Sequence, residues 1–316
     1  MTDTASGADR AGRSAPTAGD RRGFWLMVAS AILFGGTFVP SQAALDDMNP
    51  VSVVAVRFWV AALVLVPLLV RDREQARAPV AGRFAGPLIA GTVNTVGFIT
   101  ISAALERTTA SNTAFLSSLS VVVVPIVVLV ATRTRPPKAV LAGVALAVAG
   151  SYVMTGATLH IGTGDGLALL DALIASGHIL SVAYFAPRLA SAWFNVGQLA
   201  VSAIVATPLL LLTGLGDVTG RALLLAALCG VAQAVALTFQ IAGQRRLSPT
   251  SSVLVLLLVP VTGAVMGWWL TDDTLTGGDL LGGALIIASV LTVRLVPAGS
   301  RRRPVADPGD TIGSPG

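Results

Sequence analysis

The sequence predicts an all-α integral membrane protein with ten transmembrane helices, arranged as two inverted five-helix repeats. Its composition indicates the class: of 316 residues, 54% are hydrophobic and 12% are charged, and the mean hydropathy is +0.79. A soluble chain of this length cannot bury so much apolar side chain, so lipid must cover part of the surface. A second observation, an internal repeat, indicates how the helices are arranged.

The repeat relates segment 91–114 to segment 230–253, which follows at an offset of 139 residues. Asn94 aligns with Gln233, and the offset continues without a gap into the last apolar span of each half. Over the 65 positions from residue 91, 12 aligned pairs are identical, and the apolar segments and polar breaks also coincide. Such a duplication is typical of membrane proteins built from two related halves.

Residues that could hold a metal ion or a cofactor are few. Cys229 is the only cysteine, and the two histidines are His160 and His178. They leave no intramolecular disulfide and no His/Cys cluster of recognisable spacing, so neither a metal nor a cofactor is expected. No nucleophile and base face each other at a recognisable spacing, so the sequence does not predict an enzyme.

The first repeat is predicted to occupy residues 23–156. Its five apolar spans, each close to the roughly 20 residues that cross a bilayer, are 23–45, 50–70, 84–105, 109–131 and 138–155. Residues 1–22 are polar and rich in alanine and glycine, and a disordered tail is expected there. Arg21 and Arg22 before the first span also fit a signal peptide, but this span is longer than a usual signal-peptide core and the repeat requires it.

The second repeat is predicted to occupy residues 157–296. Its five spans, found by the same criterion, are 164–185, 194–215, 221–242, 250–270 and 277–296. Residues 297–316 are again polar and rich in proline and glycine, and a second disordered tail is expected.

The orientation follows from the lysines and arginines, which are retained on the cytoplasmic side of a membrane. With the N-terminus inside, the tails and the even-numbered loops carry 18 of the 21, and the odd-numbered loops carry only Arg107 and Arg221. Both termini are therefore predicted to face the cytoplasm, in the inner or plasma membrane of the cell. Because each half has five spans, the second half is inverted relative to the first. Because the basic residues are sorted by membrane side, the net positive charge of the chain does not require a nucleic-acid partner.

Several motifs carry a family resemblance. The first span contains FGGTF, the second begins at Pro50 and reaches Arg57 and Phe58, AALERTTASNTAFLSSLS leads into the fourth, and TSSVLVLLLVPV leads into the ninth. In this order and spacing, the chain resembles the ten-helix EamA-type branch of the drug/metabolite transporter superfamily over about residues 24–295. The resemblance implies a secondary transporter that exports small metabolites, amino acids or drugs. It also implies that the third, fourth, eighth and ninth helices contribute to the substrate cavity.

Two formal charges lie inside the predicted spans, away from their ends: Arg57 and Asp171. Each lies seven residues into a helix that descends from the outer side, about 10 Å below the outer boundary. An ionisable group in lipid tends to pair or to face a wet cavity, so the two are candidates for an ion pair in an outer gate. The alternatives are that Arg57 reaches the outer interface and that Asp171 binds backbone in a packed corner.

His178 follows Asp171 by seven residues, which returns it to the same helical face about 10 Å deeper. If transport is coupled to protons, Asp171 and His178 are the groups expected to titrate, with a proton passing between them through water or substrate. A buried histidine that donates to a neighbouring helix is the alternative.

Candidate substrate contacts are polar side chains on the helices of the expected cavity. The amides Asn94 and Gln233 occupy equivalent positions in the two halves, and Ser111 and Ser117 lie on the serine-rich fourth span. Amides both donate and accept hydrogen bonds, which suits a polar or zwitterionic solute. Interhelical hydrogen bonding that holds the bundle together is the alternative.

Small residues at a four-residue spacing occur on the fifth and tenth spans, as Ala145 with Ala149 and Ala284 with Ala288. Such faces allow close helix approach, so they are expected to build the scaffold or a homodimer contact. The partners expected for the chain are therefore membrane lipid, a small-molecule substrate, protons and a second copy.

The leading functional hypothesis is a secondary exporter that works by alternating access. An importer or facilitator of sugars or related solutes is the nearest alternative. A membrane scaffold or sensor that transports nothing is an alternative from another class.

Overall fold

The computed structural model describes residues 18–71, 83–105, 107–108, 110–156, 162–214, 218–270 and 274–293. Within these ranges the chain is α-helical and contains no strand. The first half contains α1 (Ala18–Gly36), α2 (Phe38–Leu45), α3 (Pro50–Arg71), α5 (Ala85–Leu105), α6 (Ala110–Ser118), α7 (Ser120–Thr132) and α8 (Lys138–Thr155). The second half contains α9 (Thr163–Phe185), α10 (Ser191–Thr213), α11 (Gly220–Gln244), α12 (Pro249–Leu256), α13 (Leu258–Leu270) and α14 (Gly277–Thr292).

These helices form the ten predicted spans, because the pairs α1 and α2, α6 and α7, and α12 and α13 each make up one span. Of the described helical segments, 9 are long and apolar enough to cross a membrane, and α14 is a shorter apolar helix. The first helix begins at Ala18, earlier than the predicted start at residue 23. The rest of the two predicted tails lies outside the described residues.

The outer surface of the bundle is apolar, as expected of a surface that faces lipid. Leucines, valines and tryptophans on several helices have more than half of their surface exposed, among them Leu63, Val130, Leu211, Leu212 and Trp269. Polar side chains such as Gln198 and Gln233 are instead fully buried. This distribution is the reverse of that in a soluble protein and confirms the membrane class.

Two of the interrupted spans break three residues before a proline. Pro40 follows the break at Thr37, and Pro260 follows the break at Leu257. Proline has no N–H to donate to the fourth carbonyl before it, and its ring crowds that carbonyl, so the helix changes direction there. At the first break, the backbone N–H and the hydroxyl of Thr37 both donate to the carbonyl of Phe34.

The third break, at Leu119 in the fourth span, has no proline at the same spacing. Here the Ser118 hydroxyl donates to the carbonyl of Phe115 at 2.6 Å, and the N–H of Leu119 donates to the carbonyl of Leu116. Side-chain bonding to the preceding turn competes with the regular ladder and bends helices.

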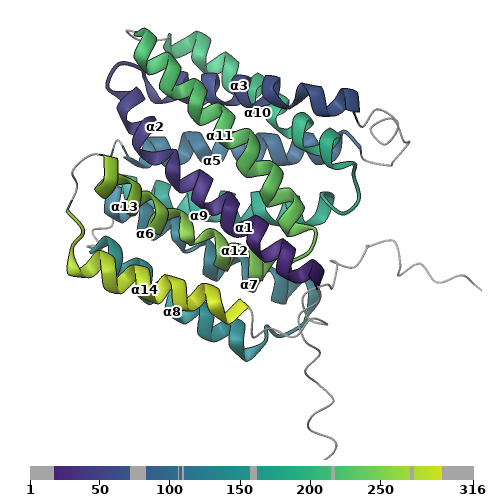
Figure 1. The fold of residues 1–316 in the computed structure, drawn as a ribbon, viewed down its shortest axis with the longest axis vertical. Coiled ribbons are helices and arrows are strands. Elements are labelled where there is room, and N and C mark those ends of the chain that lie inside the picture. Colours follow the sequence, from purple (N-terminus) through teal and green to yellow (C-terminus); the bar gives the residue numbers. More distant parts are fainter. Residues whose placement is uncertain are drawn as a thin grey trace, which may run out of the picture.

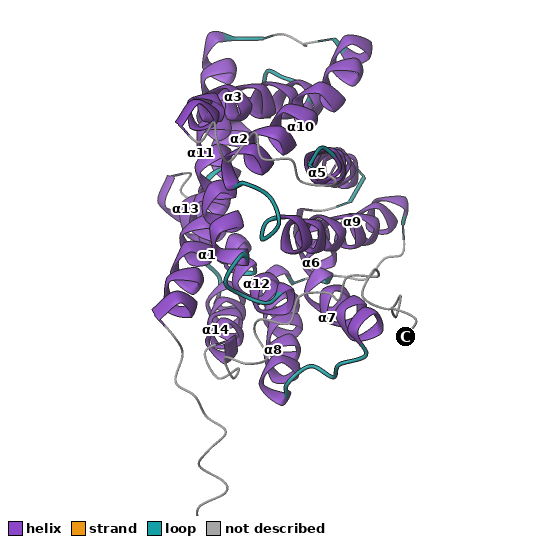
Figure 2. Ribbon diagram, turned by 90° about the vertical axis from the view of Figure 1, so that its right-hand side faces the viewer, coloured by secondary structure: helices purple, strands orange, loops and turns teal. Residues whose placement is uncertain are grey.

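Helix packing follows a pseudo-twofold symmetry between the halves. The first span packs on the eighth (α1 on α11), and the third packs on the sixth (α5 on α9), which is the same contact after the halves are exchanged. The second span packs on the seventh (α3 on α10), and the fifth packs on the tenth (α8 on α14). These two contacts lie at opposite ends of the bundle (Figure 1, Figure 2). The helix contacts thus follow the inverted repeat predicted from the sequence.

The contact between α8 and α14 depends on glycine. A Cβ atom at Gly150 would lie 2.8 Å from the carbonyl oxygen of Gly282 and 2.9 Å from the backbone nitrogen of Ile286. At Gly143, a Cβ would meet the side chain of Thr292. The two backbones therefore approach to a distance that no larger residue allows.

The alanines at a four-residue spacing on these two helices do not form this contact. Ala145, Ala149 and Ala284 are exposed and Ala288 is half-buried, whereas Gly143 and Gly150 are buried. Two residues along a helix correspond to a rotation of about 200°, so Ala145 points away from the face that Gly143 occupies. The exposed alanines remain a prediction for a homodimer contact.

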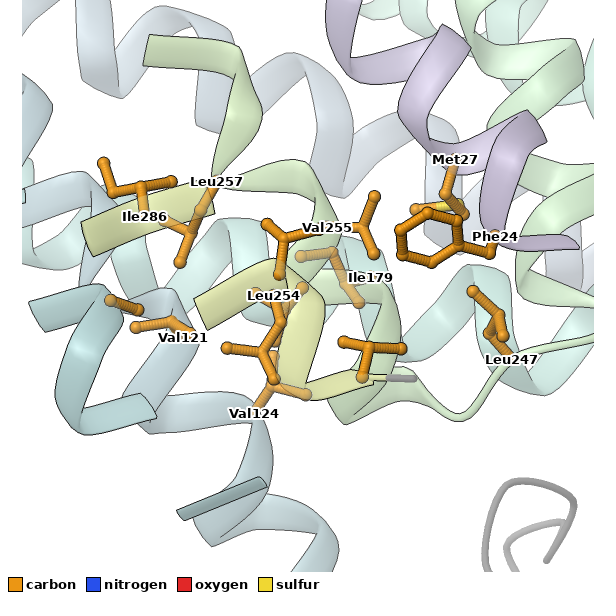
Figure 3. Packing of buried hydrophobic residues seen from close by; sticks show 14 residues of the cluster. Phe24, Met27, Val121, Val124, Ile179, Leu247, Leu254, Val255, Leu257 and Ile286 are labelled. Atoms are coloured by element: carbon orange, nitrogen blue, oxygen red, sulfur yellow. The ribbon is translucent and has the colours of Figure 1, made fainter. Parts of the chain in front are cut away.

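The largest apolar cluster lies where α1, α7, α9, α12 and α14 meet (Figure 3). Leu254 and Val255 of α12 lie at its centre, between Val124 of α7 and Ile179 of α9. Phe24 of α1, near the N-terminal end of that helix, completes the cluster. The cluster therefore joins the two halves near the membrane side on which the sequence places the N-terminus.

Candidate functional site

Arg57 is buried on α3, where that helix meets the first span and α11. Its Nε donates to the Oε1 of Gln233 on α11 at 2.9 Å, and its side chain is only 6% exposed. Its Nη2 donates to the hydroxyl of Thr37 at 3.1 Å, and its Nη1 to the hydroxyl of Ser41 at 3.4 Å. The guanidinium group thus links the broken first span to α3 and α11.

An aromatic side chain from a fourth helix covers this guanidinium group. The Cζ of Arg57 lies 5.1 Å from the ring centroid of Phe98 on α5, a cation–π contact. Phe98 in turn meets Phe58 edge to face at 5.3 Å. Cys229 lies at the same site, with its Sγ 3.4 Å from the hydroxyl oxygen of Ser41.

Asp171 is buried on α9, between α5 and α6. A Cβ atom at Gly97 would lie 3.4 Å from the Oδ1 of Asp171, so glycine makes room for the carboxyl group. The hydroxyl of Ser117 on α6 is close enough to interact with this carboxyl group, although it makes no hydrogen bond of 3.5 Å or shorter within the described chain. The structure therefore brings the candidates Asp171 and Ser117 together.

The ion pair between Arg57 and Asp171 is not formed in this structure. The partners of Arg57 among the described residues are neutral oxygens and the ring of Phe98. Arg57 does not reach the outer interface either, because its side chain is buried. The two charges lie beside consecutive residues of α5, with Asp171 against Gly97 and Arg57 over Phe98. They thus lie at a similar height along α5 but have different neighbours.

His178 belongs to a separate chain of amides. Its Nε2 lies 3.4 Å from the Oε1 of Gln198 on α10, and the Nε2 of Gln198 donates to the Oδ1 of Asn195. Asn195 then donates to the hydroxyl of Thr238 on α11 at 2.7 Å. His178 therefore bonds to a neighbouring helix, which was the alternative reading, and its partners are not those of Asp171.

The equivalent amides Asn94 and Gln233 have different roles. Asn94 Nδ2 donates to the hydroxyl of Ser202 on α10 at 3.4 Å, and Ser202 donates to the carbonyl of Gly91 at 3.0 Å. Asn94 therefore takes part in an interhelical bond, whereas Gln233 faces Arg57. Ser111 lies on α6, but its side chain is outside the described part of the chain.

Replacing Ser202 by alanine is expected to lower the stability of the bundle, because it removes the two side-chain bonds of Ser202 to α5 and leaves the Nδ2 of Asn94 without its acceptor. The cost of such a loss is about 1–2 kcal/mol. Thermal unfolding of the purified protein in detergent measures it. Ser102→Ala, which removes only a bond to the carbonyl of Phe98 one turn away on the same helix, is the control and should change the unfolding temperature less. Equal effects of the two substitutions would contradict the assignment.

A cavity of about 250 Å³ opens close to Arg57. The residues that line it come from α3, α5, the end of α10 and the residue before α3: Asn49, Pro50, Val51, Val54, Ile99, Ser102, Ala103 and Thr213. Val54 lies three residues before Arg57 on α3, and Ile99 follows Phe98 on α5. The lining residues are therefore chain neighbours of Arg57 and Phe98, and the cavity lies on the side of the membrane that the sequence predicts to be external.

Three residues of this site were not anticipated from the sequence: Thr37, Ser41 and Phe98. The position of Thr37 three residues before Pro40 could have marked it as a helix break. Ser41 and Phe98 carry no comparable signal, because an apolar span contains many phenylalanines and serines whose orientation depends on the packing.

Comparison with known proteins identifies the family. The EamA-like transporter family matches this chain twice, at residues 21–156 and 162–295, and these two segments are the two repeats. The chain belongs to the EamA-like transporter family. It is accordingly a multi-pass membrane protein of a transporter family.

Two individual proteins are also similar to this EamA-like chain, one in sequence and one in structure. A protein described as an uncharacterized transporter, from Archaeoglobus fulgidus, is 28% identical over 177 residues, which are 55% of this chain and 54% of that protein. The chain thus matches about half the length of this curated relative. A solved crystal structure, described only as that of a protein, has a TM-score of 0.72 and 18% identity over 85% of this chain and 96% of that one. At this identity the likeness shows the fold alone.

Proposed function

We propose that this protein is a secondary transporter that exports small metabolites, amino acids or drugs across the cell membrane by alternating access, with both termini in the cytoplasm. The observation that carries the proposal is the pseudo-twofold packing, in which α1 on α11 and α5 on α9 are one contact repeated. Two equivalent contacts allow the halves to exchange conformations, so that a site between them opens first to one side and then to the other.

The contacts at the predicted cytoplasmic end support this mechanism. The apolar cluster around α12 joins that helix to α7 and α9, and the Nε2 of Gln244 lies 3.5 Å from the carbonyl oxygen of Ile179. At the other end, α13 packs on α1, α2 and α14, and α6 packs on α8 and α9. A solute that passes between the halves must therefore separate α12 from α7 during each cycle.

The interrupted spans support a site near the middle of the membrane. The breaks at Thr37, Leu119 and Leu257 each interrupt the regular hydrogen-bond ladder, which is tolerated inside a membrane only where protein or a wet cavity surrounds it. Thr37 also bonds to Arg57, so one break is part of the polar site. Discontinuous helices of this kind commonly hold the substrate in secondary transporters.

Proton coupling through Asp171 is the second part of the proposal. Asp171 is a buried carboxyl group whose neighbours on α5 and α6 are Gly97 and Ser117, and neither supplies a compensating positive charge. A carboxyl group in such a place can bind and release a proton as the local water changes. His178 is the second group expected to take part, through water or substrate.

The proposal predicts solute flux by the purified chain in proteoliposomes. A panel of amino acids, metabolites, sugars and drugs is tested for uptake and efflux, with and without a pH gradient, against liposomes that lack protein. Flux of at least one amino acid, metabolite or drug is the expected result, and its dependence on the gradient measures proton coupling. Flux of sugars alone, insensitive to the gradient, would instead support a facilitator. A chain that moves nothing but retains a specific binding partner would be a scaffold or sensor.

A further inference from the structure

We propose that Arg57 receives the carboxylate group of the transported solute, so that the substrates are small molecules that carry a carboxylate. This inference rests on the proposed function as a transporter and names the substrate class of that site. It depends on the charge balance around Arg57, on the orientation of Gln233 and on a cavity lined by neighbouring residues of α3 and α5.

The first step is the charge balance. A guanidinium group has five N–H groups, and here three of them donate to the neutral oxygens of Gln233, Thr37 and Ser41. Within the described chain no carboxylate is among its contacts, although its side chain is 6% exposed. A buried, unpaired cation in a membrane protein is costly and is kept where function requires it. The missing negative charge is therefore expected from a ligand.

The second step is the orientation of Gln233. Its Oε1 accepts from Arg57, which fixes the side-chain amide so that its NH₂ group is directed elsewhere. That Nε2 is buried and has no hydrogen-bond partner in the described structure. An unmade bond of a buried donor costs free energy, so a ligand acceptor at this point would be favourable. A carboxylate has two oxygens and can accept from a guanidinium and an amide together.

The third step is access. The cavity of about 250 Å³ is lined by Val54 on α3 and Ile99 on α5, among others, and these residues are one turn or less along their helices from Arg57 and Phe98. Its walls are largely apolar, with Asn49, Ser102 and Thr213 as polar members. A small organic acid could place its apolar part against such walls while its carboxylate reaches the guanidinium group. Phosphate esters fit less well, because phosphate binding usually uses several basic groups and Arg57 is a single one.

The test measures ligand binding to the purified full-length protein in detergent, independently of transport. Thermal unfolding is followed with a panel of carboxylates from acetate to phenylacetate and leucine, each paired with its amide, at fixed pH and ionic strength. Carboxylates are expected to raise the unfolding temperature, with an apparent affinity at least about tenfold higher than that of the matching amides. Amides that stabilise the protein as well as the acids, or a panel in which no acid stabilises it, would overturn the proposal.

Two variants of one residue separate this role from a structural one. Gln233→Glu supplies an internal carboxylate to Arg57, so the protein should fold while carboxylates lose their stabilising effect. Gln233→Met has a similar size and no charge, and it should retain carboxylate binding within about tenfold, since only one amide donor is lost. Carboxylate binding by Gln233→Glu equal to that of the native chain would contradict the role of Arg57. Arg57→Gln is a weaker test, because it also removes the bonds that join α2, α3 and α11.

Transport in proteoliposomes distinguishes the failure of this inference from the failure of the proposed function. A chain that moves amides as fast as acids remains a transporter, but Arg57 is then not a carboxylate receptor. A chain that binds acids through Arg57 and moves no solute would retain the site and lose the transport function.

Discussion

Replacing Asp171 by asparagine is expected to abolish solute flux driven by a pH gradient, to the level of liposomes without protein. Asparagine has nearly the same shape and can fill the space beside Gly97, but it cannot bind and release a proton. Flux down a solute gradient alone should persist in the variant, because the proposed carboxylate contact at Arg57 is intact. The measurement is initial efflux from proteoliposomes with and without the pH gradient.

The control for this prediction is Asp165→Asn on the same helix. Asp165 lies in the first turn of α9, where its Oδ1 accepts from the hydroxyl of Thr108 at 2.7 Å. The same chemical change is thus made about 9 Å nearer the outer end of the helix, at 1.5 Å per residue. Equal loss of gradient-driven flux in both variants would show a general effect of charge removal, and unchanged flux in Asp171→Asn would leave Asp171 with a structural role only.

Replacing Gly150 by alanine is expected to lower the stability of the bundle strongly. The new methyl group would meet backbone atoms of Gly282 and Ile286, and backbone cannot move aside as a flexible side chain does. Overpacking of this kind costs about 2–3 kcal/mol, which we expect to appear as a fall of about 5 °C or more in the unfolding temperature. Thermal unfolding in detergent measures it.

Gly166→Ala on α9 is the matched control, because no atom lies within 4 Å of the Cβ position there. Alanine favours a helix over glycine by about 1 kcal/mol, so this variant should be as stable as the native chain or more stable. If Gly150→Ala were as stable as Gly166→Ala, the close approach of α8 and α14 would be wrong.

The membrane class, the helices and the duplication could be predicted from the sequence because each depends on local or periodic features. Hydropathy and length indicate a span directly, and the common offset of 139 residues relates the two halves. The first helix extends further than predicted because Asp20, Arg21 and Arg22 are polar yet compatible with a helix. Hydropathy detects the part of a helix that lies in lipid and misses polar turns beyond it.

The partners of the buried charges could not be predicted in the same way. Residue spacing gives the depth of Arg57 and Asp171 in the membrane, and this depth agrees with their positions beside consecutive residues of α5. Pairing also requires that two helices be rotated toward each other, and rotation depends on packing between distant segments. The same reason explains why Asn94 and Gln233, which align in the repeat, contact different groups.

The symmetric packing has a consequence for the origin of the chain. Each of the four main contacts, α1 on α11, α5 on α9, α3 on α10 and α8 on α14, joins one half to the other. Two copies of a single five-helix chain, inserted in opposite orientations, would form all four. These four contacts therefore do not require a covalent link between the halves, and each half is free to diverge. Arg57 is an example: it stands in the second span, whereas no basic residue stands at the corresponding place in the seventh.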